Sequence, residues 1–123
     1  MILIVEDDLI PGDVTCELLE EALGVRVCHA LNGMQAMALV ENFTPELFVF
    51  DNQLPDMHGL QLYDYFHMLM GLERIPALIV SANPPWQEIE RRQLACLQKP
   101  FDLDELISLV QRLLPRAQIP LRA

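Results

Sequence analysis

The chain has 123 residues, which is enough for one domain of ordinary size with a single core. Its hydrophobic fraction of 52% excludes a disordered chain, and no run approaches the roughly 18 apolar residues that indicate a membrane span. Eighteen acidic residues against eight basic ones give a net charge of −10, which excludes a nucleic-acid-binding surface, because phosphate contacts require clustered Lys and Arg.

The first predicted elements are a strand over residues 1–5 and a helix that ends at Gly24. The strand runs into Glu6-Asp7-Asp8, where a signal peptide would need basic residues, so we expect a cytoplasmic protein. These acids alone are also typical of a helix N-terminus. The expected buried face of the helix has residues at helical spacing, namely Ile10, Val14, Leu18 and Ala22.

A second strand, a second helix and a third strand follow. Residues 25–30 are less apolar than the first strand, which predicts a position near a sheet edge. Asn32 is a suitable N-cap for a helix that ends before Thr44-Pro45. The unbroken run Leu47-Phe48-Val49-Phe50-Asp51 predicts a strand buried on both faces. Asp51 therefore places a charge at the end of a buried strand, which is costly unless something compensates it.

The C-terminal half continues the alternation. Its elements are a loop over 53–59, a helix over 60–70, a strand over 77–80, a helix of only two turns over 86–92, and a short strand over 94–98. Asp102 and Glu105 form the capping box of the last helix, which Pro115 ends.

Five strands that alternate with five helices predict an α/β fold. We expect a three-layer, doubly wound, five-stranded parallel sheet of flavodoxin-like order 2-1-3-4-5, with a shortened or irregular fourth helix. We expect one domain over residues 1–115, a short tail over 116–123 and no output domain. The three isolated cysteines fit reduced, packed thiols better than a disulfide or a metal site: Cys16, Cys28 and Cys96.

Four of the five predicted strands end in polar side chains. These are Glu6 and Asp7 after the first strand, Asp51 on the third, Ser81 after the fourth, and Lys99, the only lysine, after the fifth. In a doubly wound sheet, a site forms beyond the carboxyl ends of the strands, where the strand order reverses. We therefore expect these five side chains to converge.

Three carboxylates in such a site repel one another. At about 4 Å and an effective dielectric near 20, each pair costs roughly 4 kcal/mol, which a divalent cation would remove. Oxygen ligands that are few in number and leave room for water suit Mg²⁺. With the positive charge of Lys99 and the hydroxyl of Ser81, the set is typical of a phosphoryl site in which Asp51 attacks phosphorus to give an acyl phosphate.

These residues also carry a family resemblance. The segments are Ile2–Asp8, Phe50-Asp51 with Leu54–Gly59, Ser81-Ala82 and Lys99-Pro100-Phe101. In this order they resemble the receiver domains of two-component response regulators, from Met1 to about Leu114.

The resemblance implies a role for each site residue. Asp51 would be the phosphoacceptor, and Glu6, Asp7 and Asp51 would hold Mg²⁺ together with the backbone carbonyl of Gln53. Ser81 would hydrogen-bond one phosphoryl oxygen, and Lys99 would pair with another and precede a cis Pro100.

The resemblance also implies partners. A histidine kinase or histidine phosphotransfer protein would donate the phosphoryl group from phosphohistidine. The modified domain would then signal through contacts with an unknown downstream protein, with homodimerisation left open. Such a domain is not an enzyme in the ordinary sense, with at most slow self-catalysed phosphorylation and dephosphorylation, and it needs neither nucleic acid nor membrane.

The sequence departs from the family pattern at Cys96, three residues before Lys99, where the family usually has Tyr or Phe as a switch. The segment between Ser81 and Lys99 is also short, and the conformation of residues 83–93 stays open. Both departures favour one alternative, a pseudo-receiver that binds partners without using phosphate. A second alternative is an aspartate-nucleophile phosphohydrolase. Such enzymes generally have Asp-x-Asp, whereas Gln53 here cannot act as the second acid.

Overall fold

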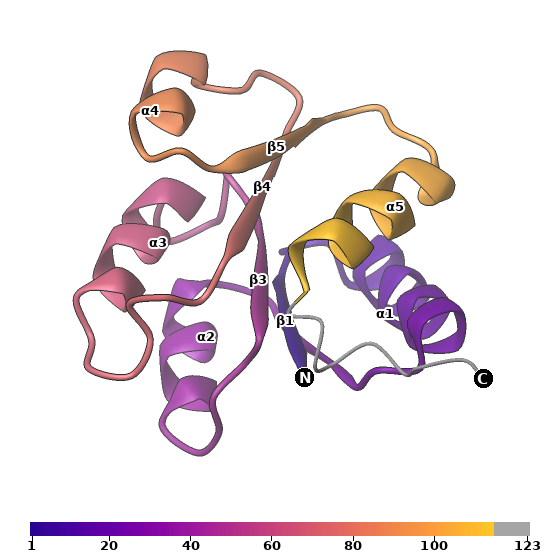
Figure 1. Cartoon of the computed structure of the whole chain (residues 1–123), viewed down its shortest axis with the longest axis horizontal. Helices are drawn as coiled ribbons and strands as arrows, with labels where there is room; N and C mark the ends of the chain where they lie inside the picture. Colours follow the sequence, from indigo (N-terminus) through magenta and orange to yellow (C-terminus); the bar gives the residue numbers. More distant parts are fainter. Residues whose placement is uncertain (115–123) are drawn as a thin grey trace.

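The structure, a computed structural model, describes residues 1–114 apart from the side chains of residues 9–12. Strands and helices alternate along it in the predicted order (Figure 1). The strands are β1 (Ile2–Val5), β2 (Val27–Ala30), β3 (Leu47–Asp51), β4 (Ala77–Ser81) and β5 (Ala95–Gln98). The helices are α1 (Leu9–Leu23), α2 (Gly33–Val40), α3 (Gly59–His67), α4 (Trp86–Arg91) and α5 (Leu103–Leu113). The predicted tail over 116–123 lies outside the described residues.

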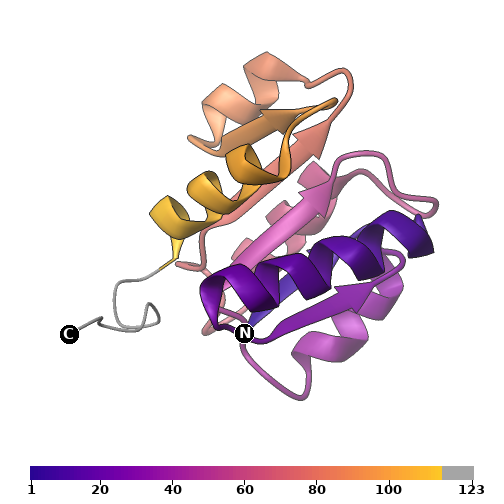
Figure 2. The same cartoon turned by 90° about the vertical axis from the view of Figure 1, so that its right-hand side faces the viewer.

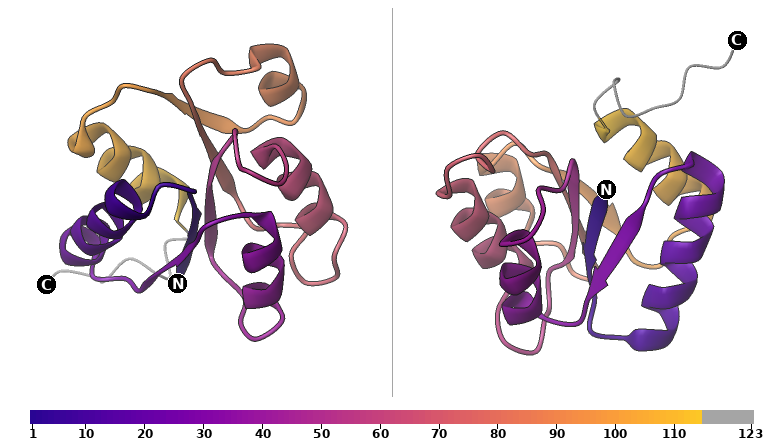
Figure 3. Two further views of the ribbon diagram at one scale, coloured as in Figure 1. Left: turned by 180° about the vertical axis from the view of Figure 1, so that it is seen from behind. Right: turned by 90° about the horizontal axis from the view of Figure 1, so that it is seen from below.

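The five strands form one parallel sheet in the order β2-β1-β3-β4-β5, which confirms the predicted doubly wound fold. Helices α1 and α5 cover one face of the sheet, and α2, α3 and α4 cover the other (Figures 1 and 3). Because all the strands run in the same direction, their carboxyl ends lie at one edge of the sheet.

The three central strands β1, β3 and β4 are buried on both faces, so the core has two halves. Leu3, Phe48 and Phe50 pack beneath α2, α3 and α4, where Phe48 stacks on Phe66 of α3 with ring centroids 4.9 Å apart. The alternate side chains of the strands, such as Ile4 and Val49, pack beneath α1 and α5. Two-sided burial is the reason that these three strands read as apolar runs in the sequence.

The predicted buried face of α1 is wrong at Val14 and Ala22, whereas Leu18 is partly buried and the side chain of Ile10 lies outside the described residues. Cys16, Leu19 and Leu23 point into the core, whereas Val14 is 50% exposed and Ala22 is exposed. The helix carries apolar side chains on two sides, and it packs beside α5 on the sheet (Figure 2). Periodicity alone does not show which of two apolar stripes will face the sheet.

Helix α3 ends at His67, three residues earlier than the predicted Met70. The N–H groups of Met68 and Leu69 donate to the carbonyls of Tyr65 and Phe66, three residues back, at 3.2 and 3.0 Å. The chain therefore tightens into turns before it reaches Gly71, which has a φ of 89° in the left-handed region.

Helix α4 is confirmed as short, with six residues. It ends at Arg91, with Arg92 as its C-cap, and Gln93 then adopts a φ of 55°, which turns the chain towards β5. Across residues 1–114, none of the helices is long and apolar enough to cross a membrane.

Candidate functional site

The six site residues predicted from the sequence lie around one cleft at the carboxyl edge of the sheet. The cleft is lined by Glu6, Asp7, Asp8, Asp51, Gln53, Ser81, Ala82, Asn83 and Lys99. Residues that are far apart in the sequence meet here because β1, β3, β4 and β5 all end at this edge.

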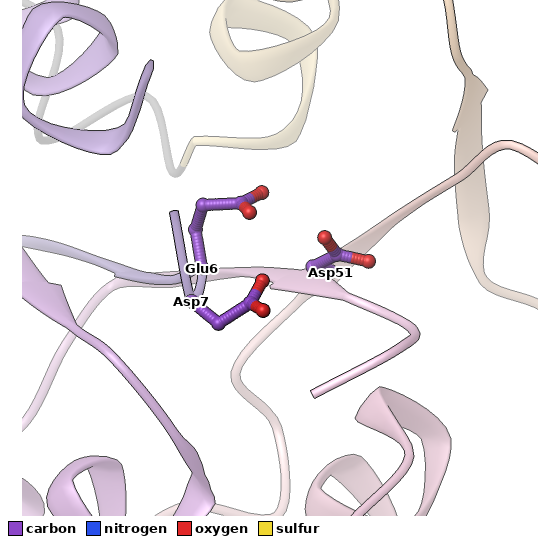
Figure 4. Close-up of side chains that lie close together, drawn as sticks. All are labelled: Glu6, Asp7 and Asp51. Carbon is purple, nitrogen blue, oxygen red and sulfur yellow. The ribbon is translucent and has the colours of Figure 1, made fainter. Parts of the chain in front are cut away.

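Three of these residues form an acidic cluster. Glu6 and Asp7 follow β1, Asp51 ends the adjacent strand β3, and their carboxylates point towards one space (Figure 4). One carboxylate oxygen from each residue lies within 4.8 Å of the other two. Asp51 is only 8% exposed, whereas Asp7 is exposed. The cluster thus reaches from the core to solvent.

The proton affinity of Glu6 reflects this crowding. Burial and, next, the charge of Asp51 raise the pKa of Glu6 to about 7. A cation between the carboxylates would relieve the repulsion, and a set made only of oxygen ligands with one side open to solvent fits Mg²⁺. The residues present therefore fit a magnesium site.

Lys99 is the positive group of the cleft. Its Nζ lies 3.0 Å from Oδ2 of Asp51 and 3.6 Å from Oε2 of Glu6. Burial alone would lower the pKa of Lys99, but the hydrogen bond to Asp51 and the charges of Asp51 and Glu6 raise it instead. One lysine therefore compensates two carboxylates. The Lys99–Pro100 peptide is cis, as the family resemblance implies.

The remaining predicted residues lie on two sides of Asp51. Ser81 is 3% exposed, and its Oγ accepts a hydrogen bond from the Asn83 N–H at 3.1 Å. The Gln53 N–H donates to Oδ1 of Asp51 at 3.0 Å, so Gln53 contacts the site through its backbone. A ligand role for the Gln53 carbonyl stays a prediction.

The sequence did not reveal the residues that support the loop after β3. Asn52 is buried, and its carbonyl accepts from the Gly59 N–H at 2.8 Å. Asp56 accepts from the N–H groups of Gly33 and Met34 at 3.0 Å each, which ties the loop to the first turn of α2. Although desolvation opposes it, these backbone hydrogen bonds lower the pKa of Asp56.

Known proteins match this chain along most of its length. The sequence model of the family described as "Response regulator receiver domain" matches residues 2–111. A protein of Leptolyngbya boryana, called an uncharacterized 14.6 kDa protein in the sodA1 3′ region, is 36% identical over 90% of this chain and 87% of its own length. Two of the first three curated relatives are longer, and the chain spans 56% and 53% of their lengths.

Solved structures match as well. The chemotaxis response regulator CheY4 of Vibrio cholerae superposes with a TM-score of 0.82 and 23% identity, over 92% of this chain and 97% of that chain, which supports the fold. The receiver domain of the sensor histidine kinase PA1611 of Pseudomonas aeruginosa PAO1 has a TM-score of 0.75 and 28% identity, over 91% and 94% of the two chains. That structure has a magnesium ion coordinated in its active-site cleft.

Proposed function

Since this chain belongs to the response regulator receiver domain family, we propose that Asp51 accepts a phosphoryl group and that the modified domain signals through protein contacts. The donor would be phosphohistidine on a histidine kinase or a histidine phosphotransfer protein. The observation that carries the proposal is the position of the Asp51 carboxylate, between the ammonium of Lys99 at 3.0 Å and the acidic pair Glu6 and Asp7.

The proposed transfer uses groups that surround Asp51. A carboxylate oxygen of Asp51 attacks phosphorus, the P–O bond forms as the P–N bond breaks, and the electron pair of the broken bond stays on the imidazole. Lys99 would pair with one phosphoryl oxygen. The Ser81 hydroxyl would donate a hydrogen bond to a second phosphoryl oxygen. Its Oγ accepts from the Asn83 N–H, so the hydroxyl hydrogen is left free for this bond.

Magnesium would be held by Glu6, Asp7, Asp51 and the backbone carbonyl of Gln53. Once bound, the ion would supply positive charge to the phosphoryl oxygens. The all-oxygen donor set, the raised pKa of Glu6 and the magnesium ion in the cleft of the PA1611 receiver support this assignment. We place the exchange in the cytoplasm, since the described cysteines are all free thiols, which suits a reducing compartment.

Phosphorylation by acetyl phosphate tests the proposal. With Mg²⁺, intact-mass spectrometry should show one added phosphoryl group on the wild type and none on Asp51→Asn. Asp8→Asn is the matched control, because Asp8 lines the same cleft but is exposed and lies outside the acidic cluster. Chelation of Mg²⁺ should abolish labelling. Equal labelling of the wild type and Asp51→Asn would contradict the assignment of Asp51.

A pseudo-receiver is the second candidate function, and Cys96 is the observation that favours it. Cys96 of β5 is partly buried and lines a groove with Trp86, Ile89 and Leu94, at the position where the family usually has an aromatic side chain. In a pseudo-receiver, partner binding would be unchanged by Asp51→Ala. In a phosphoacceptor, acetyl phosphate would alter partner binding of the wild type only.

A further inference from the structure

We propose that His29 is a positioning residue that fixes the peptide bond between Glu6 and Asp7, the two acids at the end of β1; the inference rests on the proposed magnesium site. His29 lies in the edge strand β2, and its Nε2 is 2.8 Å from the backbone carbonyl oxygen of Glu6. A carbonyl oxygen only accepts hydrogen bonds, so Nε2 is the protonated, donating nitrogen.

This hydrogen bond acts on the geometry of both acids. The Glu6 carbonyl and the Asp7 N–H belong to one planar peptide unit, so a contact that holds one of them fixes the rotations on either side. The Glu6 N–H also donates to the Ala30 carbonyl at 2.9 Å. Both backbone polar groups of Glu6 are therefore held by consecutive residues of β2.

A side chain supplies the second of these bonds because the strand pairing has ended. The pairing of β1 with β2 stops at Val5 and Ala30, and Glu6 lies one residue beyond it. The ring of His29 reaches past the last pair and donates to the Glu6 carbonyl. His29 thus extends the sheet by one hydrogen bond at the residue where the chain turns into the acidic cluster.

The position of the ring is itself constrained. The His29 side chain is 11% exposed, and its Nδ1 lies 3.4 Å from Oδ1 of Asp13 on α1. Nδ1 donates to Asp13 only when both ring nitrogens carry protons, so the positioning role rests on the hydrogen bond from Nε2 to the Glu6 carbonyl. Groups that orient metal ligands in this way typically change metal affinity about 10- to 100-fold when they are removed.

Two variants of the full chain distinguish the effect of the Nε2 hydrogen-bond donor from the effect of the aromatic ring of His29. His29→Phe keeps an aromatic ring but removes the donor, and we expect Mg²⁺ binding measured by calorimetry to weaken about tenfold or more. His29→Gln presents an amide N–H near the position of Nε2, and we expect it to restore most of that loss. With acetyl phosphate, His29→Phe should need more Mg²⁺ but reach nearly the wild-type rate at saturation.

Each result has a defined meaning. Wild-type Mg²⁺ affinity in a folded His29→Phe protein would overturn the positioning role, and so would equal losses in the Phe and Gln variants. A wild type that binds no Mg²⁺ would overturn the proposed function as well. If His29→Phe does not fold, long-range ¹H–¹⁵N spectra of the wild-type ring decide: a proton on Nε2 supports the role, and a bare Nε2 overturns it.

Discussion

At the scale of single residues, Glu6 links the acidic cluster to stability. Burial, followed by the charge of Asp51, raises the pKa of Glu6 to about 7 from its ordinary 4.5. Between these values Glu6 binds more protons in the folded protein than in the unfolded chain. The contribution of Glu6 to the free energy of unfolding is therefore fully present below pH 4.5 and falls as the pH rises towards 7.

Equilibrium unfolding without Mg²⁺ at several pH values between these limits measures that contribution. We expect Glu6→Gln to flatten the fall in stability, because an amide does not titrate. The neighbouring variant Asp8→Asn should retain it, since Asp8 is exposed and outside the cluster. An undiminished pH dependence in Glu6→Gln would show that another group titrates in this range.

Gly59 shows how closely the backbone packs under Asp51. A Cβ at this position would lie 2.6 Å from the backbone oxygen of Asp51, and neither group can move without moving β3 or α3. We expect Gly59→Ala to lower the free energy of unfolding by about 1–3 kcal/mol in chemical denaturation, the usual cost of overpacking.

Gly33 provides the matched control for that substitution. A Cβ at Gly33 would meet the end of the Met57 side chain at 2.5 Å, and a flexible methionine can move aside. The loss in Gly33→Ala should therefore be clearly smaller. Equal losses in the two variants would show that the contact with Asp51 is not the cause.

The sequence was sufficient to predict the residues at the ends of the strands. It was not sufficient to predict the residues that hold those strand ends and the loops after them in place. Asp51 and Lys99 were predictable because a polar residue after a buried run marks a strand end. His29 lies within the predicted strand over residues 25–30, and its contact with Glu6 spans 23 positions. The contact of Asp56 with Gly33 is equally distant. Local patterns carry no signal for pairings of this kind.

At the scale of elements, Arg92 fastens the short helix α4 to α3. Its Nε and Nη2 donate to the two carboxylate oxygens of Asp64 at 2.7 Å each, and Nη1 donates to Glu88 at 2.9 Å. The Arg92 side chain is 19% exposed. The hydrogen bond to Asp64 is the largest cause that raises the pKa of Arg92, and it lowers that of Asp64.

Removal of this bidentate pair should loosen α4. We expect Arg92→Met to lower the free energy of unfolding by about 1 kcal/mol and to accelerate amide hydrogen exchange across Trp86–Arg91. Arg91→Met is the control, because Arg91 is 70% exposed and pairs only with Glu88 among the described ion pairs. Similar exchange in the two variants would contradict the proposed fastening.

Element order was predictable, but element packing was not. Gly24 and Asn32 mark helix ends through their own backbone and side-chain chemistry, and the structure places both as caps. The buried face of α1 depends instead on its packing against the sheet and against α5, and α5 lies far away in the sequence. The side chain that secures α4 likewise pairs across 28 residues.

At the scale of the whole molecule, the site follows from the topology. Helices cover both faces of the sheet, so the polar ends of β1, β3, β4 and β5 have one edge at which to meet solvent (Figure 1). Alternating strands and helices were enough to predict this arrangement. In the proposed function, the response of the surface to phosphorylation would depend on the packing around α4 and Cys96.

Beryllofluoride, which mimics a bound phosphoryl group, gives the most direct test of the account. Amide spectra of ¹⁵N-labelled wild-type protein with Mg²⁺ should change on its addition at the loops that follow β1, β3, β4 and β5. Asp51→Asn should not respond, because it lacks the carboxylate that the mimic must join. An unresponsive wild type, or the same response in Asp51→Asn, would contradict the claim that Asp51 is the phosphoacceptor.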